Sequence, residues 1–592
     1  MENNIIEILK NLMACASVTN TEKEIAAETW MIDYFRRLPY YRKYPEHCGL
    51  FPIPGDPLRR STVWALVKGC GPAEGTVPGP CAVENNAAER NGKEHESSAE
   101  RVVGADDAAR EGAKDSPAVI FLGHHDVVSA DVYGDAAPWA FDPEAVTAHL
   151  VPEQLTPEAY TDLLSGEWIF GRGSCDMLGG TAAQMAVLAG QAEAVLAEQA
   201  RPTDSGASQD KKATGVPGRQ AKAEAAIKKE NAGSLLFISV PDEETFSAGM
   251  RGTLPLLEQL KETFHLDYRL AVCGEPNQRL ADGKTQVIHT GSIGKLLPVV
   301  LVQGRLVQIG SYRDGVNPLG ILSRIVASTE GDETFTEEFG GERSVPPVWM
   351  YARDLKDGYD FSLPRQAAGY CNVLTFHKTP AQVAAYFLEK IQGAVKDAPH
   401  PVAVMTWVTL WQQAKQRDGF AAFWRDTEKK TKELLQKEKK TFPEVTLWLM
   451  RQTLQFLQTD KPLVLFGFAP PYYPAVRSEE MRDAGRFAAC KKAAAALQQI
   501  VTEPYFPGVS DCSYCGLADT VRGSLYQANT PLWGRGYHFD MEALERLQIP
   551  FFLWGPWGRD LHQAGERVNR YSLTEEYPSV LRKLLQCVWL LQ

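Results

Sequence analysis

The sequence lacks any run of apolar residues long enough to cross a membrane. A membrane-spanning helix needs roughly 18 or more apolar residues in succession, and no such stretch occurs in the 592 residues. The opening segment, 1–20, is acidic and then amphipathic, without the basic start and apolar core of a secretory signal. We therefore expect a cytoplasmic protein with no membrane partner.

Basic charge and cysteine are also scarce. The 62 Lys and Arg are outnumbered by 74 Asp and Glu, which gives a formal net charge of −12. Because nucleic acids require a basic surface, a nucleic-acid partner is not expected. The 11 cysteines follow no framework spacing and are typical of reduced thiols in a cytosolic protein. Cys512 and Cys515 form one isolated CxxC, which we interpret as coincidence because no second pair accompanies it.

Two segments have almost no aromatic residues, about 69–116 and about 198–233. Their composition, rich in Ala, Gly, Glu, Lys and Gln, predicts surface insertions that are disordered in part. Both lie between apolar core segments, and a surface loop can lengthen at low entropic cost. We therefore expect them to be loops grown outward from one fold.

The segments around these insertions predict an α/β fold. Continuous apolar runs are typical of strands buried on both faces of a sheet, and strands alternating with helices indicate a sheet covered by helices. The predicted strands are 61–68, 118–122, 235–240, 270–273, 463–468 and 549–554, and the predicted helices lie within 5–38, 179–196, 420–457 and 482–500.

Candidate metal ligands lie close to these strands. GHHDVV follows 118–122 and places His124 two residues before Asp126, a spacing in which the carboxylate can orient the imidazole on a metal. GRGSCDM places Asp176 just before the 179–196 helix. The alternatives are a buried histidine satisfied by a neighbouring carboxylate and, for Asp176, a helix N-cap.

Three further motifs add carboxylates and a second histidine. PDEE follows 235–240 and carries Glu243 and Glu244, whose adjacent charges repel unless a cation neutralises them. CGEPN follows 270–273 and carries Glu275, and the segment after 549–554 carries His562. The alternatives are a solvated acidic turn, an ordinary polar turn and a surface or packing histidine, respectively.

Together the motifs predict a dinuclear metal site. Mixed imidazole and carboxylate ligands suit zinc, with manganese and cobalt as alternatives. Five ligands exceed one tetrahedral shell but suit two ions that share a bridging carboxylate. The five candidates, in chain order, are His124, Asp176, Glu244, Glu275 and His562.

The order of these motifs resembles a known superfamily. GHxDVV, GRGxxDM, DEE, GEP and a late H-x-x-x-E, with Trp139 and Asp142-Pro143 as a W-x-x-D-P element, resemble the aminoacylase, acetylornithine deacetylase, succinyl-diaminopimelate desuccinylase and carboxypeptidase G superfamily of dinuclear metallohydrolases. PDEETFSAGM, TGSIGKLLP, FAPPYYP, VSDCSYCGLAD and WGRGY are similar to one branch, the arginine-utilisation RocB family. The likeness covers nearly the whole chain apart from the two insertions.

The resemblance implies a role for each residue. Asp176 bridges two divalent ions, His124 and Glu275 complete one shell, and Glu244 and His562 complete the other. Asp126 orients His124, and Glu243 is the general base. The implied reaction is hydrolysis of an amide bond in a small N-acyl amino acid or short peptide, with a link to arginine catabolism. Two ions give a bridging hydroxide near neutral pH, and Glu243 passes its proton to the leaving amine.

The resemblance also implies two domains. A zinc-exopeptidase-like catalytic domain, formed by 1–287 and 475–592, carries an inserted α+β lid over 288–474, which helices at about 410–460 enlarge. Lids in this superfamily often form homodimers, and the sequence leaves the oligomeric state open.

The lid departs from the family pattern at one residue. RocB-like sequences have a T-H-V-G segment whose histidine contacts the oxyanion, whereas this chain reads LVQIG and has Gln308 there. A neutral donor should stabilise the oxyanion less, by about 2–4 kcal/mol if nothing replaces the histidine. His289, His377 and Arg313 are candidate replacements, although each also fits a surface or packing role. His125, beside His124, is expected to face outward.

Two other functions stay open. The first is a metal-dependent binding or regulatory protein that lost turnover with the lid histidine. The second is a cysteine hydrolase that uses Cys175 or Cys512, although no histidine motif is paired with either.

Overall fold

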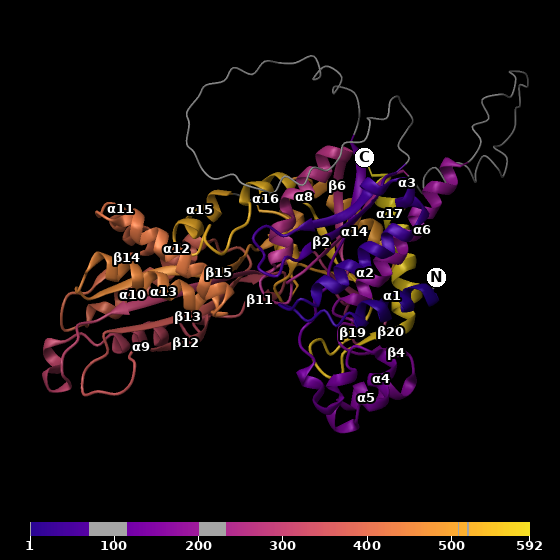
Figure 1. The fold of residues 1–592 in the computed structure, drawn as a ribbon. Helices are drawn as coiled ribbons and strands as arrows, with labels where there is room; N and C mark the ends of the chain where they lie inside the picture. Colours follow the sequence, from indigo (N-terminus) through magenta and orange to yellow (C-terminus); the bar gives the residue numbers. More distant parts are fainter. Residues whose placement is uncertain (1, 70–114, 201–231, 507, 518–519, 592) are drawn as a thin grey trace, which may run out of the picture. The chain divides into compact units, whose positions relative to one another are not determined.

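The computed structural model describes residues 2–69, 115–200, 232–506, 508–517 and 520–591 (Figure 1). The chain divides into two compact units. Unit 1 comprises Met1–Ile288, Asp483–Thr502 and Ile549–Gln592, and unit 2 comprises His289–Arg482 and Glu503–Gln548. The two predicted insertions lie almost entirely outside the described residues. Among the residues described, no helix is both long and apolar enough to cross a membrane.

Unit 1 is built on a mixed eight-stranded sheet. Its order is β1 (Cys48–Pro52), β2 (Ser61–Val67), β5 (Ser234–Val240), β3 (Ser116–His124), β6 (Leu266–Cys273), β18 (Phe551–Leu553), β7 (Gln286–His289) and β17 (Ile500–Glu503). The four central strands β5, β3, β6 and β18 are parallel, whereas β1 and β2 are antiparallel. The carboxyl ends of the parallel strands therefore meet at one edge.

Helices cover the sheet of unit 1, so its strands are apolar on both faces. Val119 and Phe121 of β3 share one hydrophobic core with helices on one face of the sheet, while Ile120 and Leu122 are buried on the other. This explains the unbroken apolar runs of the sequence. The helices contributing to that core are α1 (Glu2–Ala14), α2 (Glu24–Arg37), α3 (Pro39–Lys43), α6 (Leu178–Gln199), α14 (Ala484–Leu497) and α17 (Tyr577–Trp589). The α/β fold predicted from the sequence is confirmed.

The remaining elements of unit 1 are α8 (Ala248–Phe264) and a small lobe. The lobe contains α4 (Pro143–His149), α5 (Pro157–Ser165) and a three-stranded sheet in the order β19 (Gly558–Arg559), β20 (Arg567–Asn569) and β4 (Trp168–Phe170). It joins the segment before α6 to the segment after β18, because β20 pairs with both β19 and β4.

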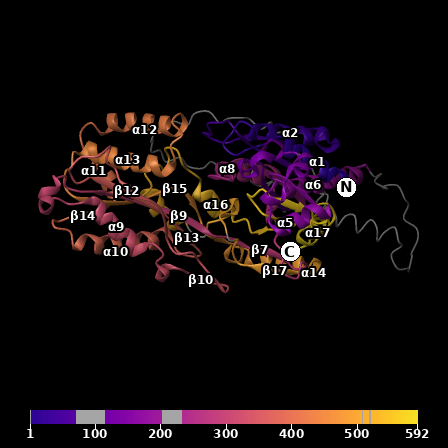
Figure 2. The ribbon, with the colours of Figure 1, turned by 90° about the horizontal axis from the view of Figure 1, so that it is seen from below.

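Unit 2 contains a five-stranded sheet in the order β12 (Val348–Asp354), β13 (Gln366–Thr375), β9 (Gly294–Gln303), β15 (Leu463–Tyr473) and β14 (Ala403–Thr406). Only β14 and β15 pair in parallel. Figure 2 shows α9 (Pro318–Thr329) and α10 (Pro380–Lys396) on one face, and α11 (Trp407–Lys415), α12 (Phe420–Gln436) and α13 (Phe442–Leu457) on the other. The other elements are α15 (Thr520–Ala528), α16 (Met541–Leu547), and the pairs β10 (Glu338–Phe339) with β11 (Glu342–Arg343) and β8 (Gly291–Ser292) with β16 (Val476–Arg477).

The division differs from the predicted domains in two segments. All of 475–592 was predicted to belong to the catalytic domain, but the short stretch 475–482 and the longer segment Glu503–Gln548 belong to unit 2. Tyrosine hydroxyls hold this segment to the backbone of β15. Tyr514 and Tyr537 donate to the carbonyl of Tyr472 at 2.7 and 3.0 Å, and Tyr526 donates to that of Ala469 at 3.2 Å. Such long-range anchors leave no local pattern in the sequence.

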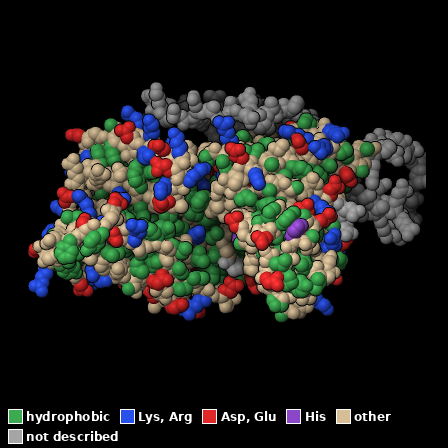
Figure 3. Space-filling view, turned by 60° about the horizontal axis from the view of Figure 1, so that its bottom comes forward, with side chains coloured by type: hydrophobic (Ala, Val, Ile, Leu, Met, Phe, Trp, Pro, Cys, Tyr) green, Lys and Arg blue, Asp and Glu red, His purple; other side chains and the backbone are tan. Residues whose placement is uncertain are grey.

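Charged side chains are mixed on the surface. On the face in Figure 3, Lys and Arg side chains lie among those of Asp and Glu instead of gathering in one patch. The face in this view therefore carries no single basic patch.

Candidate metal centre

The candidate ligands follow the parallel strands at their shared edge. His124 is the last residue of β3, Glu244 lies shortly after β5, and Glu275 lies shortly after β6. His562 comes from the loop between β19 and β20, after β18. The carboxyl ends of parallel strands are the usual place for ligand sites in open α/β sheets. All of these residues belong to unit 1.

Asp176 reaches this edge from the turn before α6. The helix can approach closely because its first turn contains Gly179 and Gly180. A Cβ at Gly180 would lie 2.0 Å from the carbonyl oxygen of Gly274, the residue before Glu275. Met177, not Asp176, is the N-cap of α6, and no side chain caps the helix there. The alternative that Asp176 is a helix cap is therefore wrong.

Asp176 faces the two histidines with different oxygens. Its Oδ1 lies 3.3 Å from Nε2 of His124, and its Oδ2 lies 3.1 Å from Nε2 of His562. Nε2 of His562 also lies 3.1 Å from Oε2 of Glu244. Ligand atoms of His124, Asp176 and Glu244 all lie within 4.8 Å of one another. This is the arrangement expected of a carboxylate between two cations.

Two more carboxylates border the same histidine. Oε1 of Glu275 lies 3.7 Å from Nε2 of His124, and Oε2 of Glu243 lies 3.9 Å from it. The side chains of His124, Asp176, Glu244 and Glu275 are each less than a tenth exposed, whereas that of His562 is half exposed. Solvent can therefore reach the centre beside His562.

The electrostatics of the centre call for a cation. Burial and the neighbouring Asp176 raise the pKa of Glu275 and of Glu244. Asp176 and Glu244 raise the pKa of His562 to about 10. Burial lowers the pKa of His124, but Asp176 and Glu243 outweigh it and raise that pKa above its ordinary value. Among the described residues, the positive charges that act on these carboxylates are those of the two histidines, and divalent ions would supply the missing charge.

Two buried atoms are also left without hydrogen bonds. Within the described residues, Nε2 of His124 and Oε1 of Glu244 have no hydrogen-bond partner. Such atoms are costly unless something else satisfies them. Both atom types are ordinary ligands of zinc, manganese and cobalt. The donor set therefore fits divalent metal ions.

Asp126 is placed differently from its predicted role. Nδ1 of His124 bonds to the backbone carbonyl of Asp126 at 2.9 Å, while the Asp126 carboxylate is 3.6 Å away. That carboxylate instead accepts the backbone N–H groups of Glu243 and Glu244, each at 3.1 Å. The backbone of Asp126 orients the imidazole, and its side chain holds the turn that carries the two glutamates.

The comparisons with known proteins agree with the sequence resemblance. No known family model matches the chain. Protein RocB of Bacillus subtilis is 24% identical over 587 residues, covering 95% of this chain and 90% of RocB. The chain is RocB-like. The uncharacterized protein YqjN of the same organism is 25% identical over 98% of this chain and 95% of its own length.

Solved structures of peptidases are more distantly similar. The Bacillus subtilis YXEP protein, described as a dinuclear metal-binding peptidase from the M20 family, aligns over 100% of the RocB-like chain and 98% of its own, with 13% identity and a TM-score of 0.46. Aminopeptidase PepT of Bacillus cereus aligns over 99% of both chains with 11% identity and a TM-score of 0.45.

The structure changes two interpretations of residues that lie beside the candidate metal ligands. His125 is fully buried and does not face outward, since its Nδ1 lies 3.0 Å from Oγ of Ser239. Cys175 is fully buried too, and burial together with the charge of Glu566 raises the pKa of its thiol. A raised pKa opposes the thiolate that a cysteine nucleophile needs, so the structure disfavours Cys175 in that role.

The structure adds buried arginines that the sequence analysis did not identify. Arg172 pairs with Glu566, which accepts the backbone N–H groups of Cys175 and Asp176 at 3.4 and 3.3 Å. Arg567 pairs with Asp560 in the loop that carries His562. Glu566 is the last residue of the H-x-x-x-E motif, so the sequence singled it out without indicating its role. No motif pointed to Arg172 or Arg567, because their partners are distant in sequence or lie in irregular loops.

Gln308 lies in unit 2 on an exposed segment that leads into a short turn, Ile309–Asp314. Its backbone forms an isolated bridge with Ser362. Its contact with the oxyanion stays a prediction. Of the candidate replacements, His289 is bonded to Glu503 at 3.1 Å, His377 lies 4.0 Å from Glu480, and the carbonyl of Arg313 bonds to His400.

Proposed function

We propose that the RocB-like chain is a metal-dependent hydrolase that cleaves an amide bond of a small N-acyl amino acid or short peptide. The observation that carries this proposal is the Asp176 carboxylate, whose two oxygens face His124 and His562. A bridging carboxylate between two mixed sets of ligands is the arrangement of a dinuclear hydrolase. The scattered cysteines, which follow no disulfide framework, support the cytoplasmic location that we propose for it.

The donor atoms suggest how two ions would be held. His124, Asp176 and Glu275 would hold one, and Asp176, Glu244 and His562 the other. Zinc suits this mixture, and manganese and cobalt are alternatives. When bound, such ions lower the pKa of water and polarise a substrate carbonyl.

Glu243 is the proposed general base. It follows Asp242 in the turn after β5 and precedes the ligand Glu244, so the turn brings it to the centre. Its Oε2 lies 3.9 Å from Nε2 of His124, and its side chain is 13% exposed. It can therefore take a proton from the attacking water and give it to the leaving amine. A positioned carboxylate of this kind contributes about 10²- to 10⁴-fold in rate.

One observation favours a second function. Gln308 stands in an exposed segment where RocB-like proteins are expected to have an oxyanion-binding histidine. A chain without that histidine could bind metal and ligand without turnover, as a regulatory or binding protein. No contact in the centre identifies the acyl group, so the link to arginine catabolism remains a prediction of the resemblance.

The test is a panel of N-acyl amino acids and dipeptides with zinc, manganese or cobalt added to the metal-free protein. We expect turnover with at least one combination of substrate and metal. Glu243→Ala should reduce kcat at least 100-fold while keeping bound metal, whereas Glu262→Ala, an exposed change on α8, should not. Unchanged activity in Glu243→Ala would refute the mechanism. Tight ligand binding without turnover under any metal would favour the binding protein.

A further inference from the structure

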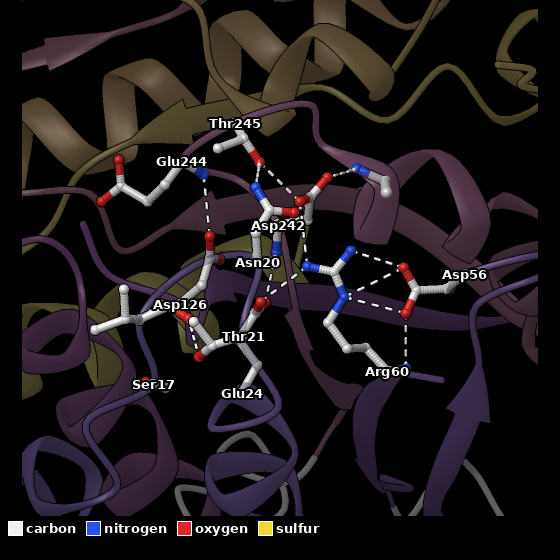
Figure 4. Close-up of polar contacts among 12 residues, drawn as sticks. Ser17, Asn20, Thr21, Glu24, Asp56, Arg60, Asp126, Asp242, Glu244 and Thr245 are labelled. Atoms are coloured by element: carbon white, nitrogen blue, oxygen red, sulfur yellow. Dashed lines mark hydrogen bonds and ion pairs between the residues drawn. The ribbon is translucent and has the colours of Figure 1, made fainter. Parts of the chain in front are cut away.

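We infer that Arg60 and Glu24 are positioning residues that fix the direction of Glu243 and Glu244. Neither lies in a metal-ligand motif, and both come from segments far from these glutamates in sequence (Figure 4). The inference rests on the proposed function, since it concerns the base and ligand of that site.

Three successive backbone N–H groups in the turn after β5 donate to buried carboxylates. Asp242 donates to Oε2 of Glu24 at 3.1 Å. Glu243 and Glu244 donate to the two oxygens of Asp126, each at 3.1 Å. Figure 4 shows Asp126 and Glu24 approaching the turn from separate segments. Glu24 therefore fixes the start of the turn, and Asp126 fixes the rest.

The turn needs such support because Asp242 has a left-handed backbone, with φ of +67°. A residue with a Cβ rarely adopts this conformation unless its surroundings impose it. The side chain of Asp242 also supports the turn, because it accepts hydrogen bonds from Oγ1 of Thr245 at 2.7 Å and from the N–H of Ala248 at 3.0 Å. A change of φ at this residue would swing both glutamates that follow it.

Arg60 links the carboxylates that support the turn. Its Nη1 donates to Oε1 of Glu24 at 2.8 Å and to Oδ1 of Asp242 at 3.1 Å. Its Nη2 donates to Oδ1 of Asp56 at 2.7 Å. The Arg60 side chain is 3% exposed, and those of the three carboxylates are 2% exposed or less. Because it stands among three buried carboxylates, losing its charge should loosen the start of the turn.

Partners that orient metal ligands typically contribute 10- to 100-fold in metal affinity or activity. Arg60→Met should therefore raise the apparent Kd for Co²⁺ by 10- to 100-fold, because Glu244 would no longer be held toward Asp176 and His562. Arg60→Lys keeps one charge but loses the forked geometry, so its Kd should lie between those of Arg60→Met and the wild type.

The test is calorimetric titration of the full-length, metal-free protein with Co²⁺, which needs no substrate. Arg269→Met is the matched control. Arg269 is also an arginine of unit 1 with a mostly buried side chain, and its Nη1 donates to the carbonyls of Val588 and Trp589 at the end of α17. That variant should lose thermal stability but keep the Co²⁺ affinity of the wild type.

A folded Arg60→Met protein with wild-type Co²⁺ affinity would overturn the inference. If Arg60→Met does not fold, Glu24→Gln and Arg60→Lys give the same test. Each weakens the hydrogen bonds that hold the turn while preserving side-chain volume. Glu244→Ala tests the site itself. If Glu244→Ala binds Co²⁺ as tightly as the wild type, the proposed metal centre fails. If Glu244→Ala weakens binding but the Arg60 and Glu24 variants do not, only the positioning role fails.

Discussion

The backbone N–H of Asp176 donates a hydrogen bond to the carboxylate of Glu566, 3.3 Å away. Glu566 is fully buried, and burial raises its pKa to about 7, although Arg172 opposes this rise. The bridging residue of the proposed metal centre is therefore fixed through its main chain as well as its side chain. Positions that touch no metal thus become testable parts of the site.

We expect Glu566→Ala to reduce the free energy of unfolding by about 3–5 kcal/mol, because it leaves the Arg172 charge buried and unpaired. Urea unfolding of the metal-free protein measures this loss. Glu144→Ala breaks an exposed pair with Lys10 and should cost about 1 kcal/mol or less. Equal losses in the two variants would show that the buried Arg172–Glu566 pair contributes no more to the free energy of unfolding than the exposed pair.

Metal binding should stabilise the fold, and Asp176 should be required for that effect. With free Co²⁺ at about 100 times its Kd, linkage predicts a gain of about 2.7 kcal/mol for each ion bound, and a higher Tm. Asp176→Ala should remove most of the gain because both ions would lose a ligand. Thermal melts with chelator and with Co²⁺ measure this, and Asp282→Ala, on an exposed turn, is the control. A full Tm gain in Asp176→Ala would contradict the bridging role.

Stability should fall as the pH drops from about 6.5 to about 4, in part because of His47. Burial lowers the pKa of His47 from 6.5 to about 4 in the folded chain, and its Nδ1 lies 2.9 Å from the hydroxyl of Tyr40. Between these values the unfolded chain binds more protons, so each pH unit costs up to ~1.4 kcal/mol. The Tm difference between pH 5 and pH 7 should therefore shrink in His47→Asn. His149→Asn, in an exposed helix end, should keep the wild-type difference.

Gln308→His should raise kcat on whichever substrate the panel identifies. Restoring a charged oxyanion donor is worth up to about 10²- to 10³-fold by analogy with the loss of such a donor elsewhere. KM should change less than kcat, because the contact forms in the transition state. Steady-state kinetics of Gln308→His and Gln308→Ala test this. Identical kcat values in all three proteins would show that residue 308 does not contact the reacting group.

Much of the fold could be predicted because the sheet of unit 1 is buried on both faces. The runs at 118–122 and 235–240 became β3 and β5, with boundaries extended by residues whose backbone pairs although their side chains are small or polar. The segment 503–548 was predicted to belong to the catalytic domain but lies in unit 2, since the hydroxyls of Tyr514, Tyr526 and Tyr537 act across long sequence distances.

The candidate site divides in the same way. His124, Glu244, Glu275 and His562 could be proposed as ligands because motifs after predicted strands carry them, and Asp176 because a motif before a predicted helix carries it. The structure brings these five side chains together. The role of Asp126 was misjudged because residue spacing cannot tell a backbone carbonyl from a carboxylate. Arg60 and Glu24 were missed because the hydrogen bonds of Arg60 to Glu24 and Asp242 join segments that are far apart in the sequence.

The order of the chain in unit 1 has a consequence for biosynthesis. Unit 2 begins at the last residue of β7, and all of it precedes β18, the strand that lies between β6 and β7 in the sheet. A ribosome therefore delivers His124, Asp176, Glu244 and Glu275 long before His562. The nascent protein therefore lacks one strand of its main sheet until β18 has been synthesised. The proposed pair of metal ions could therefore be bound completely only after His562 has been synthesised.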